Sequence, residues 1–211
     1  SVISAIIQPA MTDIERELAV HDYICSHCTY SLIGEGENIT DARGFFEHGL
    51  LQCAGYVDTF RLLARLAGLD VEIIGGPTTR DAAGAKGHAW NLIQLDGLWY
   101  VVDLTWDDRL GGDSSVEHTF FNLPQSAFGA TRTWDTDYCP AGSYALNVDE
   151  KYYYATTDYL ATSPEQGVDI VVRQLRDKNM AYVCFPGTDY AKEVTEALGA
   201  YGFSDTTCIS L

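Results

Sequence analysis

The dipeptide Asp96-Gly97 joins two apolar runs of equal length. The runs cover residues 88–95 and 98–105. They predict a β-hairpin, because a two-residue type I′ turn needs a positive φ at both central positions and Asp-Gly meets that need. Counting outward from the turn places His88 and Asp103 as diagonal neighbours on one face of the hairpin. Diagonal Cβ atoms lie roughly 7–8 Å apart or less, so an imidazole can reach a carboxylate for a hydrogen bond.

A helix is predicted from Cys53 onward, because apolar residues recur at helical spacing as far as Ala67 and Gly68 suits its C-terminal end. The thiol then lies at or near a helix N-terminus, where free N–H groups and the macrodipole favour a thiolate and lower its pKa from about 8.5. Gly55 leaves room for a group to approach the sulfur. A cysteine at such a place, followed by a histidine and an aspartate on adjacent strands, indicates thiol acyl transfer.

The segments around these residues resemble the transglutaminase-like superfamily, whose motifs have the forms C-x-G-Y-x-x-x-F, G-H-A-W-N and W-x-x-x-D-x-T-W. The resemblance spans roughly residues 11–159 and includes the opening helix LAVHDYI and the segment 118–141. It implies that Cys53 is the nucleophile, His88 the base and acid, and Asp103 the orienting carboxylate. The segments that carry the three motifs are CAGYVDTFRLLARLAGL, GHAWN and LDGLWYVVDLTWDD.

The resemblance also implies the fold class, which is α+β. A papain-like, transglutaminase-type core, with helices packed on an antiparallel sheet, is expected over residues 1–160. A small α/β appendage of unknown role is expected over residues 161–211, since a strand–helix–strand unit of this size favours a parallel crossover. Its expected elements are a helix from Ser163-Pro164, a strand over 180–185, a helix over 189–201 and a strand over 206–211. Cys184 and Cys208 are expected to meet there as reduced thiols.

Four further residues are expected to line the site: Gly55, Tyr56, Trp90 and Trp106. The two tryptophans are interpreted as excluding water. The oxyanion would be held by the backbone N–H of Cys53 and by a second donor that stays open, with Tyr30 and Gln52 as candidates. Asn91 alternates to the opposite face from His88 and is given no catalytic role.

The chain departs from the family pattern at two places. Leu51-Gln52 stands where a small residue and a valine are expected, which leaves the shape of the groove open. Arg132 stands where a histidine is expected before Thr133-Trp134.

Two places in the sequence carry residue types that can bind a metal. Thr12-x-x-Glu15 has the spacing of a capping box, and the helix that follows contains Cys25-x-x-Cys28. No second Cys/His pair has matching spacing, so buried thiols are preferred to a zinc site. His21, on the same face, is interpreted as a hydrogen-bonded core residue.

The acidic cluster Asp107, Asp108 and Asp113 could bind calcium, but a solvated rim is preferred. No metal or other cofactor is expected, and no phosphate-binding loop follows a strand.

Composition excludes several classes of partner. Thirteen basic and thirty acidic residues give a formal charge of −17, which argues against nucleic acid and anionic membranes. No segment approaches the roughly 18 apolar residues of a membrane span. Ser1–Ala10 has no features of an intact signal peptide. We expect an extracellular or bacterial cell-surface protein whose leader is absent from this chain, with a cytoplasmic location left open.

The expected chemistry is attack of the Cys53 thiolate on a peptide or carboxamide carbonyl of a protein or peptide substrate. Resolution of the thioester by water defines a peptidase or deamidase, and resolution by an amine defines a transglutaminase. Two alternatives remain: a peptide- or peptidoglycan-trimming hydrolase, and a non-catalytic binding module of a surface protein.

Overall fold

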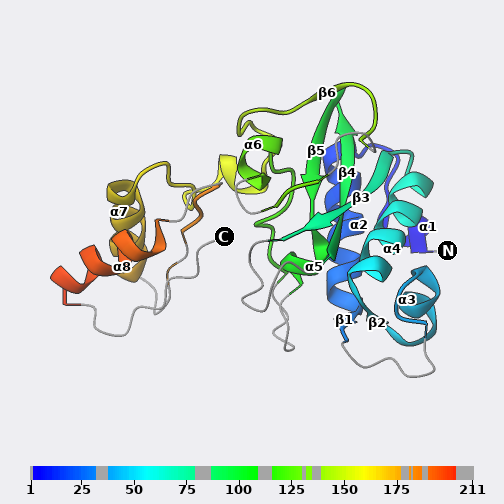
Figure 1. Cartoon of the computed structure of the whole chain (residues 1–211), viewed down its shortest axis with the longest axis horizontal. Helices are drawn as coiled ribbons and strands as arrows, with labels where there is room; N and C mark the ends of the chain where they lie inside the picture. Colours follow the sequence, from blue (N-terminus) through cyan, green and yellow to red (C-terminus); the bar gives the residue numbers. More distant parts are fainter. Residues whose placement is uncertain are drawn as a thin grey trace.

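The computed structural model describes residues 2–31, 38–78, 87–108, 116–129, 132–134, 139–176, 181, 183–186 and 190–202. Helices pack against a four-stranded sheet, in the expected α+β arrangement (Figure 1). The strands are β1 (Thr29–Tyr30), β2 (Leu50–Leu51), β3 (Asp70–Pro77), β4 (Gly87–Leu95), β5 (Leu98–Val102) and β6 (Ser143–Tyr144). The helices are α1 (Val2–Ile6), α2 (Asp13–His27), α3 (Ala42–His48), α4 (Cys53–Leu66), α5 (Leu104–Asp107), α6 (Gln125–Phe128), the 3₁₀ helix η2 (Tyr153–Thr156), α7 (Pro164–Leu175) and α8 (Ala191–Ala200).

The sheet has the order β3-β4-β5-β6, and its central hairpin has the predicted turn. Asp96 and Gly97 have φ angles of 49° and 82°, as a type I′ turn requires. The predicted register is confirmed from Leu95 opposite Leu98 outward to Asn91 opposite Val102. The expected antiparallel sheet is present from β3 through β5, and the expectation is wrong at one edge, where β6 pairs with β5 in parallel.

The second strand of the hairpin is shorter than predicted. It ends at Val102, and residues 104–107 form the helical turn α5 instead of continuing to Thr105. The cause lies outside the hairpin, because the N–H of Asp103 donates to the carbonyl of Phe120, 3.2 Å away. The carbonyl of Asp103 then accepts from the N–H groups of Trp106 and Asp107, at 3.1 and 3.2 Å, which starts the turn.

The helix α2 begins with the predicted capping box. The hydroxyl of Thr12 accepts from the N–H of Glu15, and the Glu15 carboxylate accepts from the N–H of Thr12 at 2.7 Å. α2 packs on α4, which in turn covers β3 and β4. Cys25 and Cys28 are buried thiols facing the carbonyls of Leu104 and Ile24, in agreement with the preferred interpretation.

The helices α7 and α8 lie beside the sheet domain in Figure 1 and share a separate apolar cluster. α7 starts as predicted, with Ser163 as N-cap and Pro164 in the first turn. Of the strand expected over 180–185, the described part forms one parallel bridge, between Cys184 and Leu160. Cys184 contacts the hydroxyl of Tyr152 at 2.6 Å. The predicted cap Asp189, the strand over 206–211 and Cys208 lie outside the described residues, and the division at residue 160 stays a prediction.

None of the helices in the described ranges is long and apolar enough to cross a membrane.

Glu17 is a fully buried acid on α2. Its Oε2 accepts from Asn122 Nδ2 at 2.9 Å, while Oε1 has no hydrogen-bond partner among the described residues. Burial outweighs the Asn122 hydrogen bond and raises the pKa of Glu17 to about 8.

We predict that Glu17→Gln will flatten the pH dependence of stability. A raised carboxyl pKa means that the folded state binds the proton more tightly than the unfolded state, so stability is lost as the pH rises from the ordinary carboxyl pKa of 4.5 to about 8. Over that window the loss is roughly 1.4 kcal/mol per pH unit at most. Urea unfolding at pH 5 and pH 8 measures it, and an equal pH dependence in the two proteins would contradict a neutral Glu17.

Candidate active site

Cys53 is the first residue of α4, so its sulfur lies at the helix N-terminus as predicted. The side chain is half-buried. A hydrogen bond with His88 lowers the pKa of the thiol and outweighs the opposing effect of burial. The backbone N–H groups of Ala54 and Ala89 act in the same direction. The surroundings of Cys53 therefore favour the thiolate.

His88 lies on β4 between the thiol and a carboxylate. Its Nε2 is 2.8 Å from Asp103 Oδ2, so the predicted pairing of the two side chains is present. The indole Nε1 of Trp106 is 3.0 Å from the same nitrogen, which leaves Nδ1 for Cys53. Burial disfavours the imidazolium, but the hydrogen bonds with Asp103 and Cys53 outweigh it and raise the pKa of His88 to about 9. In that protonated form Nε2 donates to Asp103.

Asp103 is 1% exposed and precedes the first residue of α5. Its Oδ2 also accepts from Nη2 of Arg132 at 3.3 Å. In the sequence, Arg132 stands out only as a departure from the family pattern. No local signal identifies the contact, because 29 residues separate the two partners.

The two tryptophans flank His88 differently. Trp90 is fully buried behind it, with ring centroids 6.0 Å apart, and packs against Phe128 and Trp134. Trp106 is partly exposed and touches the imidazole directly. Both lie beside the site, as predicted.

Gly55 and Tyr56 have other roles than the predicted lining of the site. A Cβ at Gly55 would lie 2.5 Å from the carbonyl oxygen of Ile39 and 2.7 Å from Leu51 Cδ2. The glycine therefore admits the neighbouring backbone and not a group that approaches the sulfur. Tyr56 is fully buried in the core, and its hydroxyl donates to Asp108. Both predictions failed because a helix residue next to the nucleophile can point away from it.

At Leu51-Gln52, where the chain departs from the family pattern, the first residue lies in the core and the second precedes α4. Leu51 is fully buried and belongs to β2, which pairs in parallel with β1. Gln52 is the N-cap residue of α4 and makes no side-chain cap hydrogen bond. The choice of a second oxyanion donor between Tyr30 and Gln52 stays a prediction. Asn91 lies away from His88, as expected, and its Nδ2 donates to the carbonyls of Val57 and Glu72.

The acidic cluster is not the solvated rim that the sequence favoured. Asp107 is fully buried, accepts from the N–H of Phe120 at 2.9 Å, and pairs with His21 at 3.2 Å. Asp108 is bound by the hydroxyl of Tyr56. Asp113 lies outside the described residues.

Within the described ranges, His21, Asp22 and His118 form a group that could hold a metal ion. Their ligand atoms lie within 4.8 Å of one another. One carboxylate oxygen of Asp22 already pairs with both imidazoles, at 3.0 and 2.7 Å. Burial opposes a proton on His21, but its bonds to Asp107 and Asp22 outweigh it and raise its pKa to about 9. Both ring nitrogens of His21 thus already face a carboxylate, so this arrangement favours a hydrogen-bonded network.

Part of the chain is similar to known proteins. Residues 1–104 match the family model of the transglutaminase-like superfamily, and the match includes Cys53, His88 and Asp103. This part of the chain is a transglutaminase-like domain. The kyphoscoliosis peptidase of Homo sapiens is 31% identical over 131 residues, which cover 56% of this chain and 20% of that protein. Its counterpart in Mus musculus is 30% identical over 131 residues with the same coverage. The chain thus spans about a fifth of the length of these relatives.

Two solved structures are also similar. One is a protein from Cytophaga hutchinsonii described as a cysteine protease, with 17% identity, a TM-score of 0.42, and coverage of 49% of this chain and 35% of that chain. The other is a TGase, with 15% identity, a TM-score of 0.43, and coverage of 86% and 49%.

We predict that Cys53 alkylates faster than Cys139, the other half-buried cysteine of the described part, at pH 6. The lowered pKa of Cys53 and the pKa of about 9 of His88 bracket the range in which thiolate and imidazolium coexist. A free thiol with a pKa of about 8.5 is under about 1% ionised at pH 6. Iodoacetamide labelling with site mapping should show a preference of about tenfold or more, lost in His88→Ala. Equal rates at the two cysteines, or an unchanged rate without His88, would exclude a thiolate–imidazolium pair.

Proposed function

We propose that this chain catalyses thiol-dependent acyl transfer on peptide or carboxamide groups of protein substrates. The observation that carries the proposal is the continuous hydrogen-bonded chain from the Cys53 thiol through His88 to the buried Asp103. Membership of residues 1–104 in the transglutaminase-like superfamily supports it, as does the name peptidase given to the relatives of Homo sapiens and Mus musculus.

In the first step, the Cys53 thiolate attacks the carbonyl carbon and forms a C–S bond. The resulting oxyanion takes a hydrogen bond from the N–H of Cys53 and from the second donor. His88 then gives its Nδ1 proton to the leaving nitrogen as the C–N bond breaks, which releases an amine or ammonia and leaves a thioester.

In the second step, the neutral His88 accepts a proton from the acceptor at the same nitrogen. Water as acceptor yields a carboxylate, and a primary amine yields a new amide; in both cases the thiolate leaves and is stabilised again by the imidazolium. Asp103 holds the imidazole throughout, so that the ring nitrogen faces the reacting atoms in both steps.

The properties of Cys53 and His88 argue against the alternative of a non-catalytic binding module. A binding surface needs neither a thiol with a lowered pKa nor a histidine oriented toward it by a buried carboxylate.

The proposal predicts that wild-type protein cleaves casein or attaches a fluorescent primary amine to it, and that Cys53→Ser abolishes both. Asp103→Asn keeps the shape but removes the charge that stabilises the imidazolium, so the rate should fall about 10²–10⁴-fold. Cys139→Ser is the matched control and should retain full activity.

Release of peptides without amine incorporation would identify water as the acceptor, and incorporation would identify transglutamination. A wild-type protein that gives neither product, and no thioester adduct by mass spectrometry, would favour the binding module.

A further inference from the structure

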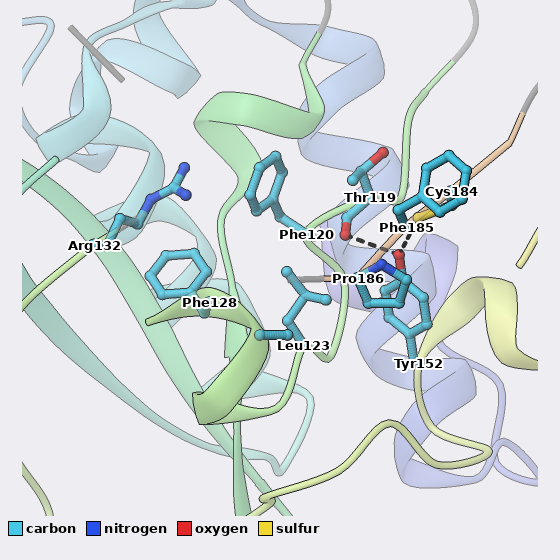
Figure 2. A pocket seen from close by; sticks show the side chains of 10 residues that line it. Thr119, Phe120, Leu123, Phe128, Arg132, Tyr152, Cys184, Phe185 and Pro186 are labelled. Atoms are coloured by element: carbon cyan, nitrogen blue, oxygen red, sulfur yellow. Dashed lines mark hydrogen bonds between the residues drawn. The ribbon is translucent and has the colours of Figure 1, made fainter. Parts of the chain in front are cut away.

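Arg132 is a buried cation behind the proposed nucleophilic site. It is 2% exposed, and its guanidinium carbon lies 4.3 Å from the ring centroid of Phe128 and 4.7 Å from that of Phe120. Figure 2 shows these three side chains among those lining a small cavity of about 10 Å³. The Trp106 ring, which contacts His88, is 5.4 Å from the same carbon. The aromatic shell thus holds the guanidinium in one place.

A buried positive charge costs several kcal/mol unless an anion compensates it. Asp103 supplies that anion, since its Oδ2 lies 3.3 Å from Nη2 of Arg132 and both side chains are fully buried. The same oxygen is 2.8 Å from Nε2 of His88. One carboxylate oxygen therefore serves two cations when the imidazole is protonated.

We propose that Arg132 is a positioning residue that fixes the carboxylate of Asp103 and limits how strongly that carboxylate retains the proton on His88. The inference rests on the proposed function, because it concerns the acid–base group of the same site. An arginine does not release its proton in proteins, so its charge is constant over the working pH range.

The charged groups that face His88 determine how strongly the imidazole holds its proton. Cys53 approaches from α4 and Asp103 from the start of α5, while Arg132 lies behind Asp103. The two anionic partners favour the imidazolium. Arg132 offsets part of the charge of Asp103 and so opposes it. This balance matters because His88 must give its proton to the leaving nitrogen, and a proton held too tightly slows that step.

The test compares two substitutions. Arg132→Met removes the charge but keeps an apolar stem against Phe120 and Phe128, and Arg132→Lys keeps the charge but loses the planar fork. Histidine-labelled protein is titrated by NMR, with the His88 signal among the five histidines assigned through His88→Gln. His21, bound to Asp107 and Asp22, is the internal control.

We expect Arg132→Met to move the His88 titration to higher pH by about one unit, a tenfold gain in proton affinity, with His21 unchanged. The alkaline limit of kcat, at which His88 loses the proton that it must give to the leaving nitrogen, should move the same way, and kcat should fall with little change in KM. Arg132→Lys should leave the His88 titration within a few tenths of a unit of wild type and lower kcat.

An unshifted His88 in Arg132→Met, alongside a lower Tm, would assign Arg132 to packing alone and overturn the inference. An equal shift in Arg132→Lys would also overturn it, because the charge is retained there. If Arg132→Met does not fold, the Arg132→Lys titration still tests the inference, because a shift of about one unit there would overturn it. The titration needs no substrate, so an inactive wild-type protein would refute the proposed function without deciding the role of Arg132.

Discussion

The buried carboxylate of Asp103 is the constraint on which the site depends. An ionised group at 1% exposure must be paired and hydrogen-bonded. His88 at 2.8 Å and Arg132 at 3.3 Å provide the pairing. The backbone of the same residue ends β5, because its N–H bonds to Phe120 and its carbonyl starts α5. One residue therefore orients the imidazole and sets the point at which the chain leaves the sheet.

Hydrogen bonds connect His21 on α2 to Asp103 by way of Asp107 and the backbone of Phe120. The N–H of Phe120 donates to Asp107, which pairs with the buried His21, while the carbonyl of Phe120 accepts from the N–H of Asp103. Phe120 is thus held between the buried carboxylate of Asp107 and the backbone N–H of Asp103. Such support is what a reacting group needs, since a displacement of about 1 Å can cost a site most of its rate.

The sequence predicted those parts that short-range chemistry decides. The turn at Asp96-Gly97 fixed the register of the hairpin, and that register brings His88 within 2.8 Å of Asp103. The capping box at Thr12 and the start of α4 at Cys53 are likewise local. The resemblance to a known family supplied the roles, which spacing alone would have left open.

The parts that failed are set by contacts between distant segments. The early end of β5 depends on Phe120, and the burial of Asp107 depends on His21, 86 residues away. Arg132 shows the limit most clearly. As a residue in a polar stretch it would ordinarily be assigned to solvent, yet two aromatic rings and a buried carboxylate enclose it. A buried ion pair between residues far apart in the chain produces no periodic pattern in the sequence. The only sign of this pair in the sequence was therefore that Arg132 departs from the family pattern.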